Sequence, residues 1–130
     1  MACLDTELLV EFLRGDARAI SLIERIAAEE GSACTTAVNA YELLKGALIS
    51  SRPEANLKRV VQLLGGLEVI PLTAEVSRAA AEVLAALRSK GRSIGEFDIL
   101  IAGMVMERGE TLVSRDDDFS SVRGLERARW

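Results

Sequence analysis

Short apolar segments that can form β-strands alternate with longer amphipathic segments along the whole chain. The strand candidates are residues 2–4, 32–35, 67–71, 111–114 and 125–129. Apolar residues recur at helical spacing between them, and the predicted helices cover residues 6–13, 17–30, 37–50, 53–64, 74–89 and 96–107. Short strands that alternate with helices are typical of a parallel sheet covered on both faces. We therefore predict an α/β fold with three layers, α/β/α, around a short, mainly parallel central sheet of four or five strands.

The composition is that of one folded domain. No repeat, low-complexity tract or linker divides the 130 residues, so we expect a single domain over residues 1–130. The chain is 49% hydrophobic and 28% charged, which separates it from disordered sequences. No apolar run reaches the roughly 18 residues of a membrane span, and the N-terminus lacks the pattern of a signal peptide. We expect a cytoplasmic protein with no membrane contact.

The chain contains no histidine, and this excludes several kinds of site. Ser-His-Asp and Cys-His catalysis and the usual zinc sites all need that residue. The two cysteines, Cys3 and Cys34, have no neighbouring ligand residues, and we expect both to be small buried hydrophobes. The net charge of −4 argues against nucleic-acid binding through net charge alone, but it suits a concentrated acidic site.

Five of the six aspartates lie in three places: Asp5, Asp98 and the triplet Asp116, Asp117 and Asp118. Asp5 follows the first predicted strand and the triplet follows the fourth. Parallel strands end at the same edge of a sheet, where ligands bind in folds of this class. If the first strand is central and the fourth is its neighbour, these carboxylates converge.

Two further acids lie within predicted helices. Asp98 shares a helical face with apolar residues, where it either caps the helix or belongs to a site, because a buried carboxylate needs a partner. Considered without the other acids, Glu42 is explained as a solvated helix residue. Gly46, one turn later, is costly within a helix and suggests the close approach of another backbone or a ligand.

Together these acids suggest a site for a hard cation. Oxygen ligands without His or Cys favour Mg²⁺ or Mn²⁺. A cation held by a few carboxylates can activate water and offset the charge that develops on phosphoryl oxygens. The residues therefore point to metal-dependent phosphoryl chemistry.

Four segments in order carry a family resemblance: "LDT", "AVNAYELLKG", "SIGEFDILIAG" and "TLVSRDDDF". They resemble the PIN-domain ribonucleases, in particular the VapC-type toxins of prokaryotic toxin–antitoxin pairs. The resemblance implies a PIN-like fold and an endoribonuclease that depends on Mg²⁺ or Mn²⁺. Such an enzyme cleaves single-stranded or looped RNA to a 5′-phosphate and a 3′-hydroxyl. It also implies that the protein is the toxin of a type II pair.

The same resemblance assigns roles to the acids. It places the catalytic and metal-binding positions on Asp5, Glu42, Asp98 and Asp116. Asp5 and Asp98 are the expected principal ligands, Asp116 completes the site, and Glu42 either binds a second metal or orients the attacking water. The expected supporting residues are Ser114, Asp118 and Thr6, and Asp117 is expected to be solvated.

The sequence departs from the family pattern in two places that bear on the structure. Glu7 stands where a small polar residue is usual, and it either adds a carboxylate to the site or caps the first helix. Gly103 replaces the more usual alanine. Neither change touches an expected ligand.

The expected partners are RNA, a small antitoxin protein and a second copy of the chain. Lys45, Arg92 and Arg115 are candidate RNA contacts, with ordinary surface charges as the alternative for each. The antitoxin is expected to cover the acidic pocket with its C-terminal segment. The expectation of a homodimer rests on apolar helix positions beyond those that one sheet face needs, namely Val76, Val83, Leu84, Leu43 and Leu48.

Two alternatives to the ribonuclease stay open. One is a non-catalytic PIN-fold module that binds protein. The other is a Mg²⁺-binding phosphoacceptor receiver domain, which needs an Asp after the third strand and a Lys after the fifth. The third predicted strand ends in Pro71 and Leu72 without an Asp, and no Lys follows Lys90.

Overall fold

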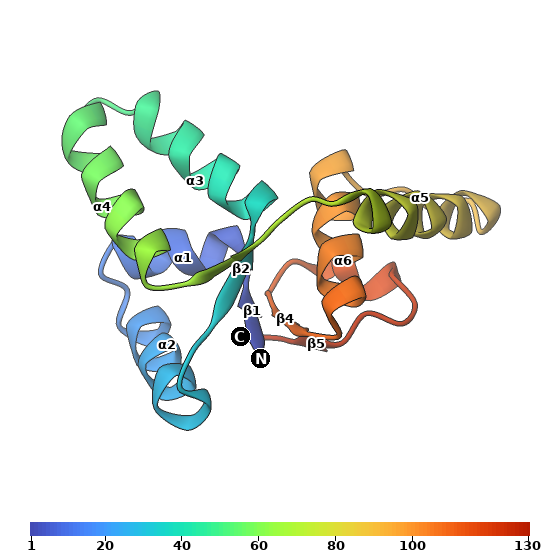
Figure 1. The fold of residues 1–130 in the computed structure, drawn as a ribbon, viewed down its shortest axis with the longest axis horizontal. Coiled ribbons are helices and arrows are strands. Elements are labelled where there is room, and N and C mark those ends of the chain that lie inside the picture. The colour runs from blue at the N-terminus through green and yellow to red at the C-terminus, as the bar shows by residue number, and fades with distance from the viewer.

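A five-stranded sheet runs through the middle of the protein, with helices on both faces (Figure 1). The computed structural model describes all residues, Met1–Trp130. The strands are β1 (Ala2–Leu4), β2 (Cys34–Thr36), β3 (Glu68–Ile70), β4 (Thr111–Val113) and β5 (Arg127–Ala128). Their order is β3-β2-β1-β4-β5 and every pairing is parallel. The predicted α/β fold is confirmed, with β1 central and β4 beside it.

Six helices connect these strands, close to the predicted ranges. They are α1 (Thr6–Leu13), α2 (Ala17–Glu30), α3 (Ala37–Leu48), α4 (Pro53–Gly65), α5 (Ala74–Ser89) and α6 (Glu96–Arg108). The acidic segment after β4, expected as a loop, contains a short 3₁₀ helix, η1 (Asp117–Ser121). None of the helices has the length and apolar character that a membrane crossing requires.

The second strand begins two residues later than predicted. Gly31 ends α2 in the left-handed conformation at φ 77°. The chain needs Ser32 and Ala33 to turn back toward the sheet, and pairing with β1 starts where Cys34 lies opposite Cys3. Both cysteines are fully buried and unbonded to each other, as expected for small core residues.

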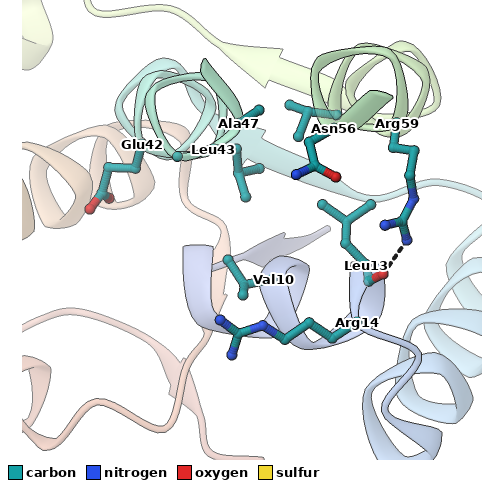
Figure 2. Close-up of a pocket in the computed structure, with 10 residues that line it drawn as sticks. Val10, Leu13, Arg14, Glu42, Leu43, Ala47, Asn56 and Arg59 are labelled. Atoms are coloured by element: carbon teal, nitrogen blue, oxygen red, sulfur yellow. Dashed lines mark hydrogen bonds between the residues drawn. The ribbon is translucent and has the colours of Figure 1, made fainter. Parts of the chain in front are cut away.

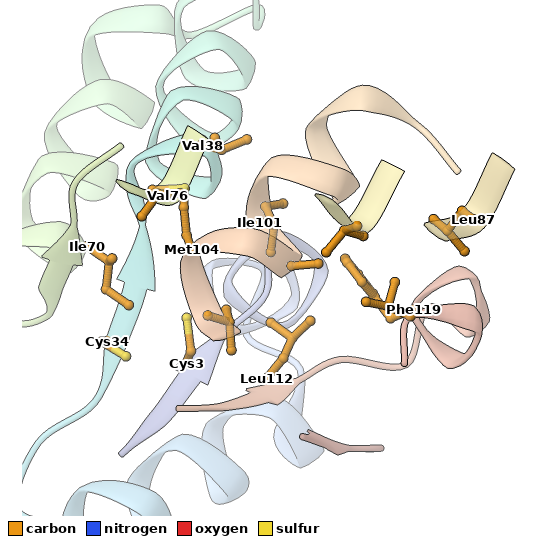
Figure 3. Packing of buried hydrophobic residues seen from close by; sticks show 14 residues of the cluster. Cys3, Cys34, Val38, Ile70, Val76, Leu87, Ile101, Met104, Leu112 and Phe119 are labelled. Carbon is orange, nitrogen blue, oxygen red and sulfur yellow. The ribbon is translucent and has the colours of Figure 1, made fainter. Parts of the chain in front are cut away.

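Alternate residues of the strands face two separate cores. Cys3, Cys34 and Leu112 pack against α5 and α6, with Met104 and Phe119 in the same cluster (Figure 3). The other face of the sheet carries residues such as Leu4 that pack against α1, α2, α3 and α4. Burial on both faces explains why the central strand β1 is apolar at every position, without alternation.

The close approach of two backbones occurs at Gly103 and not at Gly46. A Cβ on Gly103 would lie 2.9 Å from the backbone of Ala80, so α6 packs directly on α5 at this point. A Cβ on Gly46 would meet nothing within 4 Å. The expectation of another backbone close to Gly46 was therefore wrong. Gly46 instead lines an open cleft, so the alternative of a ligand at this position stays a prediction.

Most of the helix positions that were expected to be surplus for one sheet face are used by the fold. Val76, Val83 and Leu43 are buried in the cores, and Leu84 is half-buried. Leu48 alone of the five is exposed, at 57%. Three of the five positions are already used by the fold because helices cover both faces of the sheet.

The two glycines should respond in opposite ways to alanine. We expect Gly103→Ala to lower the free energy of unfolding by about 1–3 kcal/mol, because the new methyl group meets backbone. Gly46→Ala should raise it by about 0.5–1 kcal/mol, because alanine favours an open helical position. Urea denaturation of both variants checks this. Equal effects of the two changes would contradict the packing described for α5 and α6.

Candidate metal centre

The ends of β1 and β4 bring two segments of the acidic site together. Leu4 pairs with Val113, so Asp5 and Ser114 lie side by side immediately beyond the two strands. Ser114 Oγ donates a hydrogen bond of 2.6 Å to Asp5 Oδ2, and it accepts one of 3.1 Å from the backbone N–H of Asp116. The hydroxyl of Ser114 therefore links Asp5 to the acidic turn, residues 116–118.

Asp5 is held on its other oxygen as well. Its Oδ1 accepts from the backbone N–H of Thr6 at 2.9 Å, which caps α1, and from Asn39 Nδ2 at 3.0 Å. Asp5 is only 7% exposed. Burial raises the pKa of Asp5, and the hydrogen bonds from Ser114, Thr6 and Asn39 act against that rise. Both oxygens are thus fixed by protein donors.

Asn39 is a site residue that the sequence analysis missed. It is fully buried near the start of α3, where it forms a reciprocal cap with Thr36. Its Oδ1 accepts from the Thr36 hydroxyl at 2.6 Å, and its Nδ2 donates to Asp5 and to Thr6 Oγ1, the latter at 2.8 Å. The Thr-x-x-Asn spacing at a helix start was the available signal, because an amide there has a polar partner on each side.

Thr6 connects this network to Glu42. The Thr6 hydroxyl donates to Glu42 Oε1 at 3.0 Å. Glu42 is half-buried on the edge of a cleft whose apolar wall is formed by α1, α3 and α4. Figure 2 shows its carboxylate directed away from Leu43 and Ala47 of that wall. Glu42 therefore lies at the edge of the cleft, and its carboxylate binds Thr6 and points away from the apolar wall.

Three other carboxylates form the tightest acidic group. One oxygen each from Asp98, Asp116 and Asp118 lies within 4.8 Å of the others. Asp98 comes from the first turn of α6, and Asp116 caps η1 by accepting from the backbone N–H of Asp118 at 2.9 Å. The 3₁₀ turn directs Asp117 elsewhere, where Arg127 and Arg129 bind it. The structure thus groups Asp118 with the expected ligands Asp98 and Asp116.

The acids of this edge have no protein counterion. None of the ion pairs of the structure involves Asp5, Glu42, Asp98, Asp116 or Asp118. Burial raises the pKa of Asp98 to about 6, and the nearby charges of Asp116, Asp5, Glu42 and Asp118 act in the same direction. Carboxylates that repel each other without a Lys or Arg partner fit a bound divalent cation, and the all-oxygen donor set fits a hard one.

The three candidate RNA contacts have different surroundings. The Lys45 ammonium lies 5.4 Å from the ring centre of Tyr41 and 5.8 Å from that of Phe97. Arg115 pairs with Glu7 at 2.8 Å, so Glu7 serves as its partner and not as an added site carboxylate. Arg92 is exposed and lines a shallow depression together with Asp118. Arg115 directly precedes Asp116 in the chain, and Phe97, beside Lys45, directly precedes Asp98.

Comparison with known proteins gives one consistent result. The PIN domain model matches residues 2–125. The tRNA(fMet)-specific endonuclease VapC of Shigella flexneri is 30% identical over 128 residues, which cover 98% of this chain and 96% of that protein. Ribonuclease VapC11 of Mycobacterium tuberculosis is 31% identical over 125 residues, which cover 94% and 91% of the two chains.

Solved structures agree with this result. DNA-bound VapBC from Salmonella typhimurium superimposes with a TM-score of 0.89 at 26% identity, covering 99% of this chain and 97% of that one. VapBC2 from Rickettsia felis, bound to a DNA fragment from its promoter, gives a TM-score of 0.91 at 24% identity. That alignment covers 99% of this chain and 98% of the other, and it supports the fold.

The acidic centre, formed by Asp98, Asp116 and Asp118, should make the metal-free protein less stable as the pH rises. Asp98 has a pKa of about 6 in the folded protein against an ordinary value of 3.8, so the folded state binds its proton more tightly. Its contribution to stability is present below pH 4 and is lost as the pH passes 6. In EDTA, we expect Asp98→Asn to match the wild type near pH 4 and to be more stable by about 1–2 kcal/mol at pH 7.5, after allowance for solvent screening.

Chemical denaturation across this pH range, with Asp117→Asn as the control, provides the measurement. Asp117 already has Arg127 and Arg129 as partners, so its replacement should not produce the same gain at pH 7.5. A constant difference between wild type and Asp98→Asn at all pH values would contradict the described repulsion.

Proposed function

The chain belongs to the PIN-domain family, and from this premise we propose that it is a metal-dependent endoribonuclease, the toxin of a toxin–antitoxin pair. The relatives of matching length are RNA-cleaving VapC proteins. The observation that carries the proposal is the group of Asp98, Asp116 and Asp118 at the sheet edge, without a counterion. The substrate would be single-stranded or looped RNA in the cytoplasm.

The cofactor proposed for this site is Mg²⁺ or Mn²⁺. Asp98, Asp116 and Asp118 would hold it, since their oxygens already lie within 4.8 Å of one another. A bound divalent cation supplies activation of a water molecule and stabilises negative charge on the phosphoryl oxygens. Asp5 would keep the position of the acidic turn through Ser114, and it remains a candidate ligand if its hydrogen bonds rearrange.

Glu42 would orient the attacking water. Its Oε1 is occupied by the Thr6 hydroxyl, which fixes the carboxylate and leaves Oε2 to accept a proton from water. Thr6 is itself held by Asn39, which also binds Asp5. The chain therefore couples the position of Glu42 to that of Asp5 through two polar side chains.

The proposal includes a small antitoxin partner and a homodimer. The cleft of Figure 2 has an apolar wall that includes Val10 and Leu43, and it opens beside Glu42. Arg14 and Arg59 stand at its edge, and Arg59 donates to the carbonyl of Leu13. A partner segment bound in this cleft would reach the acidic site, which is how an antitoxin would block cleavage.

Replacing members of the acidic group should abolish RNA cleavage. With Mn²⁺ and single-stranded RNA, we expect Asp98→Asn, Asp116→Asn and Asp118→Asn each to lower the cleavage rate by at least about 100-fold, because each removes a charged ligand. Asp117→Asn should stay within about twofold of the wild type, because its exposed ion pairs lie outside the group. Gel analysis of end-labelled RNA measures these rates.

Two outcomes would contradict the proposal. Undiminished cleavage by Asp98→Asn would remove the acidic group from the chemistry. A wild-type protein that leaves every tested RNA intact with Mn²⁺ would favour the non-catalytic protein-binding module instead.

A further inference from the structure

A second cleft lies between α2 and the segment that follows β5. Its charged lining residues are Arg18, Arg25 and Arg129, and no acidic residue lines it. The chain as a whole carries a net charge of −4. The cleft is therefore positively charged although the protein as a whole is negatively charged. Such a local positive charge favours the binding of an anion.

Two of the arginines have no partner within the protein. Arg18 and Arg25 lie on the same face of α2, two turns and roughly 10 Å apart along the helix axis. Both are exposed, and neither takes part in any ion pair. Arg129, in contrast, is bound by Asp117. The two guanidinium groups of α2 are thus available for an external acceptor.

Trp130 gives the cleft an aromatic wall. Its indole Nε1 is buried and has no hydrogen-bond partner. Because this N–H group is shielded from solvent, only the ring of Trp130 is open to a ligand in the cleft. The Arg115 guanidinium lies 4.1 Å from the centre of the Trp130 ring.

The cleft adjoins the acidic centre. Arg115 directly precedes Asp116 in the chain, and it stacks on Trp130, which lines the cleft. β5 runs parallel to β4, so the segment after β5 leaves the sheet at the same edge as Asp116. A strand of nucleic acid positioned at the acidic centre would therefore have this cleft on one side of its path.

We propose that this arginine cleft binds the sugar–phosphate backbone of the RNA on one side of the cleaved bond. The inference rests on the proposed ribonuclease function and names a binding site for its substrate. Arg18 and Arg25 would each bind a phosphate, which planar guanidinium groups do with two hydrogen bonds. Trp130 would contact the same strand through its ring. The position beside the acidic centre favours RNA over an acidic protein segment.

The test compares the double variant Arg18→Ala/Arg25→Ala with Arg78→Ala/Arg88→Ala. The control removes the same charge from exposed positions of α5, across the sheet from α2. Binding of labelled single-stranded RNA is measured by fluorescence anisotropy in EDTA, so that no cleavage occurs. We expect the first variant to bind about tenfold more weakly at low salt, and its plot of log K against log salt to be shallower by about 1.4, the value for two lost phosphate contacts.

Trp130 offers a direct probe because it is the only tryptophan of the chain. RNA should change its fluorescence in the wild type and in the control variant, and much less in Arg18→Ala/Arg25→Ala. With Mn²⁺, that variant should show a raised KM for long RNA and an unchanged kcat. A dinucleotide substrate, too short to reach the cleft, should be cleaved equally by all three proteins.

The outcomes separate this inference from the function on which it rests. If the wild type cleaves RNA but the two double variants bind it equally, the cleft does not bind RNA and the ribonuclease proposal stands. If the wild type cleaves no RNA, both the ribonuclease proposal and the proposed role of the cleft are contradicted. Binding of a polyglutamate peptide that depends on Arg18 and Arg25, with RNA binding that does not, would assign the cleft to an acidic protein segment and overturn the inference.

Discussion

The buried carboxylate of Asp5 joins three parts of the chain at one point. Thr6 at the start of α1, Asn39 in α3 and Ser114 after β4 all donate hydrogen bonds to it. A buried carboxylate without donors would be costly, so these three elements are stabilised in the one arrangement that supplies them. The positions of Glu42 and of the acidic turn follow, because Thr6 binds Glu42 and Ser114 binds the backbone of Asp116.

The carboxylates of the acidic centre repel one another, and a bound cation would reduce this repulsion. Asp98 has a raised pKa because it is partly buried among other acids that no Lys or Arg neutralises. This arrangement lowers the stability of the metal-free protein, and it would favour the binding of a divalent cation. Three arginines close to the site contact other groups instead. Arg127 and Arg129 bind Asp117, and Arg115 binds Glu7.

Much of this organisation could be predicted from the sequence, because it depends on strand ends. The alternation of strands and helices gave the fold, and the rule for parallel strands placed Asp5 beside the acidic triplet. What remained hidden depends on tertiary contacts. Asn39 is uncharged and was not among the predicted metal ligands, although it binds both Asp5 and Thr6. The difference between Asp117 and Asp118 depends on the 3₁₀ turn, which side-chain periodicity does not reveal in so short a segment.

The glycines and the arginine cleft also depend on tertiary contacts that the sequence alone does not predict. Helix propensity identifies Gly46 as costly but cannot tell an open face from a close contact, and the contact is at Gly103. The cleft combines α2 with the segment after β5, more than 100 residues apart in the chain. Its arginines appear along the sequence as ordinary helix charges. Only the arrangement of the sheet brings them to the edge that carries the acids.

The most direct test of the account is the proton release that accompanies Mn²⁺ binding. Calorimetric titration of the wild type in two buffers of different ionisation enthalpy gives the number of protons released at pH 6 and at pH 8. Since Asp98 has a pKa of about 6 and must lose its proton to bind the ion, release should be larger at pH 6 by about half a proton. Mn²⁺ binding with equal proton release at both pH values, or no binding at all, would contradict the account.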